Sequence, residues 1–183
     1  VVPSLPALSE VHVDARDIDA LSALVAFLKR EYGGPLGMVG FSYGASYALI
    51  AAGRPAIADL VSFVVSFGAY YDLGEIYRRL HAAPPPQCDA EWDNRIYLDL
   101  VAAYRLRDQF PLAPTDFERI VELLRGYCHI ESTDSKRRFY DRVLAEHQFF
   151  KRHSMAQDAP HFAGVSPQGQ LSQLRCAVGL VQD

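Results

Sequence analysis

The residues with the clearest chemical potential form the sequence Gly40-Phe41-Ser42-Tyr43-Gly44. An apolar run over residues 36–41 leads into Ser42, and an alanine-rich stretch over residues 43–52 follows it. The run predicts a short buried strand, and the stretch predicts a helix. A serine on so sharp a turn between strand and helix has a strained backbone and an exposed hydroxyl. The two glycines let strand and helix cross closely, because neither has a Cβ. The pattern therefore predicts a nucleophilic serine.

A helix that begins directly after Ser42 leaves backbone N–H groups without helical partners in its first turn, and these favour negative charge. We therefore expect the backbone N–H of Tyr43 to stabilise the oxyanion that forms when a serine attacks a carbonyl. The competing interpretation is that Ser42 is only a small residue that tolerates a tight turn. Its place between a strand and a helix favours the nucleophile.

The flanking sequence predicts the elements that position this turn. Residues 1–3 have the pattern of a strand end, residues 4–13 that of a loop, and Asp14 that of the N-cap of a helix ending at Gly33. Further strands are predicted over residues 60–67, which are rich in β-branched and aromatic residues, and over residues 176–181. Alternation of strands and helices predicts an α/β fold with a mostly parallel sheet.

The middle of the chain has a different pattern. Between residues 75 and 160 no strand is evident, and apolar residues recur at helical spacing. We interpret residues 1–74 as a core that carries the serine turn, residues 75–160 as a helical lid inserted into it, and residues 161–183 as the return to the sheet.

Composition excludes several classes of function. The 183 residues are 50% hydrophobic and 22% charged, and a net charge of −4 gives no basic face for nucleic acid. No apolar run approaches the length of a membrane span, so no membrane partner is expected. The three cysteines are too few and too widely spaced for a disulfide framework or a metal cluster, which favours a reducing, cytoplasmic setting. No metal and no organic cofactor is called for.

In these features the chain resembles the α/β-hydrolase superfamily, and within it the bacterial esterase-like serine hydrolases with a helical lid. The serine turn carries the resemblance, with support from the strand at residues 60–67 and from residues 166–178, which are similar to the approach to the family's late strand. The resemblance implies that Ser42 forms an acyl-enzyme with a small ester or related acyl substrate. On this comparison the chain is incomplete at both ends: residues 1–3 correspond to the fourth strand, and the second oxyanion donor and the triad histidine lie outside it. Several strand edges would then lack partners.

The resemblance implies that the triad acid follows the strand at 177–181, where Asp183 is the candidate. Asp72 is an alternative acid, because a minority of the family places the acid after the strand that follows the nucleophile; its other interpretation is a helix cap. The histidines are typical of solvated or locally bonded residues, with His161 the best placed of them: His12, His81, His129, His147, His153 and His161. The alternative function is a non-catalytic, hydrolase-like module that binds a ligand or partner and lacks a complete triad. The oligomeric state is not predicted.

Overall fold

The computed structural model describes residues 1–9, 13–82 and 159–182, together with isolated positions between 93 and 139. The chain divides into two compact units, one formed by Val1–Ile76 with Phe162–Asp183 and the other by Tyr77–His161. In the second unit the isolated described positions are helical, and the assignment of residues 75–160 as a lid stays a prediction. Of the helices in the described ranges, none combines the length and the apolar character needed to span a membrane.

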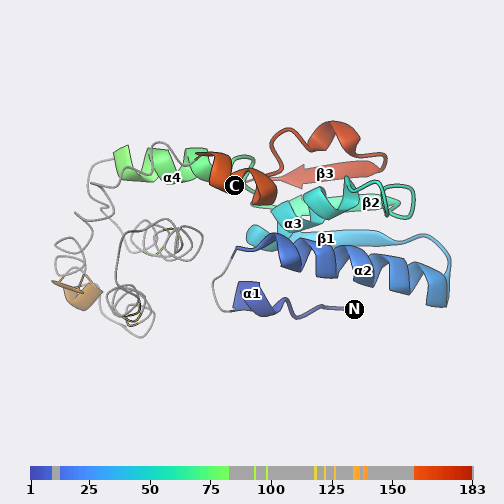
Figure 1. The fold of residues 1–183 in the computed structure, drawn as a ribbon, viewed down its shortest axis with the longest axis horizontal. Coiled ribbons are helices and arrows are strands. Elements are labelled where there is room, and N and C mark those ends of the chain that lie inside the picture. The colour runs from blue at the N-terminus through green and yellow to red at the C-terminus, as the bar shows by residue number, and fades with distance from the viewer. Residues whose placement is uncertain are drawn as a thin grey trace. The chain divides into compact units, whose positions relative to one another are not determined.

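The first unit contains three parallel strands in the order β1-β2-β3 (Figure 1). They are β1 (Gly37–Phe41), β2 (Phe63–Phe67) and β3 (Ala177–Val181), and each was predicted within a few residues. In the observed register Gly40 lies beside Ser66 and Ser66 beside Leu180. Strand, helix, strand and returning strand thus form an α/β sheet, as the alternation predicted.

The predicted strand end at residues 1–3 is wrong. Val1 and Val2 lie outside the sheet with 93% and 97% of their surface exposed. The physical reason is that a strand is stable only against a neighbour, and Pro3 supplies no N–H for a ladder. The loop predicted over residues 4–13 also contains a short helix, α1 (Pro6–Ser9).

One longer helix covers a face of β1 and β2, and a second longer helix packs against the first. Helix α3 (Tyr43–Ala52) packs on both strands and is buried from Ala45 to its end, while α2 (Ala15–Tyr32) packs against α3. Asp14 is the N-cap of α2, as predicted, and its side chain accepts a hydrogen bond from the Arg16 N–H at 2.8 Å. Gly33 ends the helix with a positive φ of 62°.

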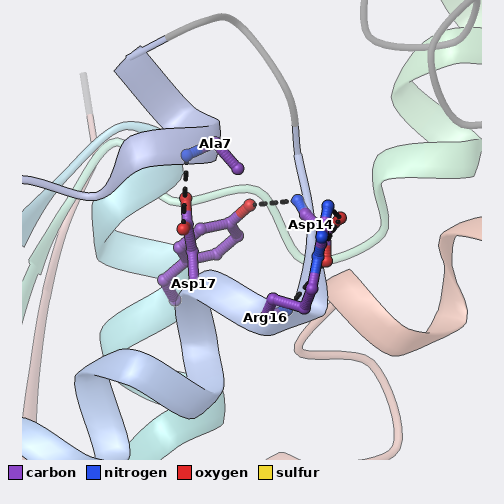
Figure 2. Close-up of polar contacts among 5 residues, drawn as sticks. Ala7, Asp14, Arg16 and Asp17 are labelled. Atoms are coloured by element: carbon purple, nitrogen blue, oxygen red, sulfur yellow. Dashed lines mark hydrogen bonds and ion pairs between the residues drawn. The ribbon is translucent and has the colours of Figure 1, made fainter.

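Polar contacts join the first helices at the start of α2 (Figure 2). The backbone N–H of Asp14 donates to the hydroxyl of the fully buried Tyr47 in α3, at 2.8 Å. The buried carboxylate of Asp17 accepts from the backbone N–H of Ala7 at 3.4 Å. These bonds connect residues far apart in sequence, so they hold α1 and α2 against the helix that begins beside Ser42.

The segment that returns to the sheet docks onto the loop after β2. It includes two 3₁₀ helices, η3 (Ala159–Val165) and η4 (Leu171–Gln173). The Tyr70 hydroxyl donates to the Val165 carbonyl at 2.7 Å, and the Ser166 hydroxyl accepts from the N–H of Leu73 at 3.1 Å. Leu73 begins helix α4 (Leu73–Ala82). These buried bonds fix the loop beyond the carboxyl end of β2.

Candidate active site

Ser42 joins the end of β1 to the start of α3 in an uncommon backbone conformation. Its φ of 51° and ψ of −125° make it the only non-glycine residue with positive φ in the described part of the chain. Such a conformation costs about 1–3 kcal/mol and persists only where the surroundings enforce it. The Ser42 N–H donates to the Phe67 carbonyl of β2 at 2.8 Å, and the Ser42 carbonyl accepts from the Ala45 N–H at 3.0 Å. The sheet and the helix therefore hold the strained turn from both sides.

The hydroxyl of Ser42 has no capping role. A serine at this position of a helix usually accepts a hydrogen bond from a backbone N–H in the first turn. Ser42 is the N-cap residue of α3, yet its side chain makes no such bond, and the residue is exposed. Helix capping therefore does not account for a serine here, and the hydroxyl is available for chemistry.

The two glycines of the motif differ in the space that surrounds them. A Cβ added at Gly40 would lie 2.5 Å from both the Ala45 Cα and the Gly44 carbonyl oxygen, so only glycine allows this crossing of strand and helix. A Cβ added at Gly44 would meet nothing within 4 Å. The expectation of a close crossing is thus confirmed for Gly40 and wrong for Gly44, where the Cβ direction leads into open space.

The first turn of α3 offers backbone donors next to Ser42. The Ser42 carbonyl accepts hydrogen bonds from the N–H groups of Ala45 and Ser46, at 3.0 and 3.4 Å. The N–H groups of Tyr43 and Gly44 donate no hydrogen bond within the described residues. These two donors lie at the positive end of the helix dipole, where developing negative charge is stabilised. The geometry suits the oxyanion role expected of the Tyr43 N–H.

The side chain of Tyr43 packs instead of reacting. Its ring meets the Tyr70 ring edge to face, with centroids 5.4 Å apart, and burial raises the pKa of Tyr43 to about 12. A phenol with this pKa is neutral near pH 7 and does not serve as a general base. Tyr70 is held in turn, because its carbonyl accepts from the Ser46 hydroxyl at 3.0 Å. The Tyr43 side chain therefore forms a wall beside Ser42.

Asp72, the alternative acid, makes the bond expected of a helix cap. Its carboxylate accepts from the backbone N–H of Glu75 at 3.1 Å, in the first turn of α4. This contact explains an acidic residue at position 72 without a catalytic role.

The remaining predicted partners of Ser42 lie outside the described residues. These are Asp183 and the side chains of all six histidines: His12, His81, His129, His147, His153 and His161. Within the described ranges no three His, Cys, Asp or Glu side chains are grouped so that they could hold a metal ion. The described part of the candidate site thus consists of the exposed Ser42 hydroxyl and the backbone N–H groups of Tyr43 and Gly44.

A cavity of about 720 Å³ borders this turn and was not anticipated from the sequence. It follows β1 along its length and reaches Phe41 and Gly44, which flank Ser42. Most of its lining is apolar, from β1, α2 and residues 1–5. The sequence gives only an indirect indication of this cavity, because the small number of predicted strands leaves strand edges without predicted partners.

Comparisons of this chain with protein-family models, with curated proteins and with solved structures found no match.

Proposed function

We propose that this chain is a serine hydrolase of the α/β-hydrolase type, with Ser42 as the nucleophile that cleaves a small ester or related acyl substrate. One observation carries the proposal: Ser42 has a strained backbone and a hydroxyl that caps nothing. A strained residue whose side chain makes no stabilising hydrogen bond is typical of a functional position.

In the proposed reaction the Ser42 Oγ forms a bond to the carbonyl carbon and its proton passes to a histidine base. The carbonyl oxygen becomes an oxyanion that accepts a hydrogen bond from the Tyr43 N–H. Loss of one such donor typically raises the barrier by about 2.7–4 kcal/mol. Collapse of the tetrahedral intermediate returns the proton to the leaving alcohol and leaves an acyl-enzyme, which water hydrolyses. The candidate triad acid is Asp183, with Asp72, which caps α4, as the less favoured alternative. Residues 75–160 act as the lid, and the setting is cytoplasmic.

A fluorophosphonate probe tests the nucleophile, because it phosphonylates an activated serine and leaves a structural one unmodified. In a protein that includes the triad histidine, we expect one adduct by intact mass and its location at Ser42 by peptide mapping. The Ser42→Ala variant should take up no probe, whereas Ser62→Ala, which removes another exposed serine, should label like the parent chain. Labelling that survives in Ser42→Ala would contradict the proposal.

A second candidate is a non-catalytic binding module, and the apolar cavity beside β1 favours it. Such a module needs no reactive serine. Failure to label in a protein that includes the triad histidine, together with binding in the cavity, would support this candidate over the hydrolase.

A further inference from the structure

The first turn of α3 lacks the usual support of a helix start. Its cap residue, Ser42, gives the helix no side-chain hydrogen bond, and Gly44 within the turn is a poor helix former. Helix ends fray, and a side-chain cap is the common means of holding them. A nucleophilic serine cannot supply this cap without turning its hydroxyl toward the helix and away from a substrate. Other residues must therefore hold the turn that carries the proposed oxyanion donors.

Tyr70 contacts this turn at two places. Tyr43 and Ser46 are three residues apart, so they lie on the same side of the helix. The Tyr43 ring meets the Tyr70 ring edge to face with centroids 5.4 Å apart, and the Ser46 hydroxyl donates to the Tyr70 carbonyl at 3.0 Å. Ser46 is fully buried, and Tyr70 is only 8% exposed. One residue outside the helix thus anchors both the first and the fourth residue of α3.

These two contacts are strong enough to replace a cap. An aromatic pair and a buried hydrogen bond each contribute about as much to stability as a side-chain cap does. Both contacts act on the turn that contains the N–H groups of Tyr43 and Gly44, which donate no hydrogen bond within the described residues. The position of these two donors therefore depends on Tyr70.

The segment that returns to the sheet fixes Tyr70 in turn. The Tyr70 hydroxyl donates to the carbonyl of the buried Val165 at 2.7 Å. The next residue is held as well, because the Tyr71 carbonyl accepts from the Gln168 N–H at 3.0 Å. All of these residues belong to the first unit. The ring and the carbonyl of Tyr70 are thus a fixed support for the start of α3.

We propose that Tyr70 is a positioning residue for the hydrolase reaction: it holds the first turn of α3 so that the Tyr43 N–H stays directed toward the oxyanion. This inference rests on the proposed function, because it needs an oxyanion beside Ser42. Tyr70 takes the place of the cap that Ser42 gives up as a nucleophile. Since the oxyanion exists only after the attack, support for its donor lowers the energy of the transition state and leaves substrate binding unchanged.

Amide hydrogen exchange in the 183-residue chain tests the hold on the turn without any need for activity. The N–H groups of Ala45 and Ser46 donate to the Ser42 carbonyl, so their exchange accelerates when the first turn opens. We expect Tyr70→Leu and Ser46→Ala each to accelerate exchange at these two amides by about three- to tenfold, the factor by which loss of one such contact raises the opening constant.

The matched control for the exchange measurement is Ser22→Ala. It also removes a buried serine hydroxyl, but one that donates to the Ile18 carbonyl at 2.8 Å within α2. Exchange at Ala45 and Ser46 should stay within about twofold of the parent in this variant, because the change lies outside the locally opening turn.

Turnover of p-nitrophenyl acetate, in a protein that includes the triad histidine, tests the catalytic consequence. We expect Tyr70→Leu to lower kcat by about tenfold, with KM within about twofold of the parent, since complete loss of an oxyanion donor costs about 100- to 1,000-fold in kcat. Tyr70→Phe keeps the ring beside Tyr43 and should restore kcat to within about threefold of the parent. The matched control is Tyr71→Phe, which removes an exposed hydroxyl from the neighbouring residue and should leave both constants unchanged.

The outcomes separate this inference from the proposed function. Unchanged kcat in Tyr70→Leu, a rise in KM alone, or exchange that accelerates no more than in Ser22→Ala would overturn the role of Tyr70 and leave the hydrolase intact. If Tyr70→Leu does not fold by circular dichroism, Ser46→Ala carries the same test, with kcat expected to fall about threefold. A parent protein that neither cleaves the ester nor reacts with the fluorophosphonate would remove the proposed function, and accelerated exchange would then make Tyr70 a purely structural support of α3.

Discussion

Replacement of Ser42 by glycine should stabilise the protein while it removes the proposed nucleophile. The Ser42 side chain makes no capping bond, so no such contact is lost. Glycine adopts φ near 51° without the clash that a Cβ creates, which relieves about 1–3 kcal/mol of strain. The greater freedom of glycine in the unfolded chain costs about 0.5–1 kcal/mol. The difference is a net stabilisation of about 0–2.5 kcal/mol.

The reference for this measurement is Ser42→Ala, because alanine keeps the Cβ and its strain but lacks the hydroxyl. Both variants are unfolded in urea and followed by far-ultraviolet circular dichroism, with similar slopes required before their free energies of unfolding are compared. We expect Ser42→Gly to be the more stable of the two by about 1 kcal/mol. Neither variant should react with the fluorophosphonate.

A Ser42→Gly variant that is less stable than Ser42→Ala would contradict the expected strain. In that case the positive φ of Ser42 stores no strain, and strain gives no support for a functional role of this turn. If glycine stabilises and labelling of the parent chain requires Ser42, stability and reactivity are opposed at this residue, as expected of a functional position.

Three further predictions concern neighbouring residues. Gly40→Ala should lower the free energy of unfolding by about 1–3 kcal/mol through overpacking against Ala45, whereas Gly44→Ala should raise it by up to about 1 kcal/mol through helix propensity; urea unfolding measures both. Asp72→Asn should retain both stability and labelling because asparagine caps equally well, and a loss of labelling at unchanged stability would identify Asp72 as the acid. The Tyr43 pKa of about 12 lies above its unfolded value of about 10, so its contribution to stability is complete below pH 10 and is lost as the pH rises to about 12. The parent chain should therefore lose more stability than Tyr43→Phe between pH 10 and about 12, and this difference measures the contribution of the phenol. Equal losses of stability in the two proteins would contradict the burial of the phenol.

Local patterns were sufficient for most elements of the first unit. Asp14 and Gly33 bound α2 as predicted, because caps act on the backbone within a few residues. Strand β2 begins at Phe63, later than the predicted residue 60, because residues 54–60 form turns in which the N–H groups of Ile57 and Ala58 donate to the Arg54 carbonyl. Residues 1–3 have a strand-like composition but form no strand, because Pro3 supplies no N–H for a ladder.

The sequence by itself determined where the serine turn lies and which residues form it, because a strand, a glycine, a serine and a helix follow one another within a few residues. Only the tertiary structure decided that the Ser42 side chain makes no capping bond, that the Tyr43 phenol packs against Tyr70 while its N–H donates to no described residue, and that an apolar cavity lies beside β1. These properties depend on Phe67, Tyr70 and α2, which are distant in sequence and meet the turn only when the sheet forms. Spacing along the chain can predict a nucleophile on a strained turn, but the contacts that surround it follow from packing.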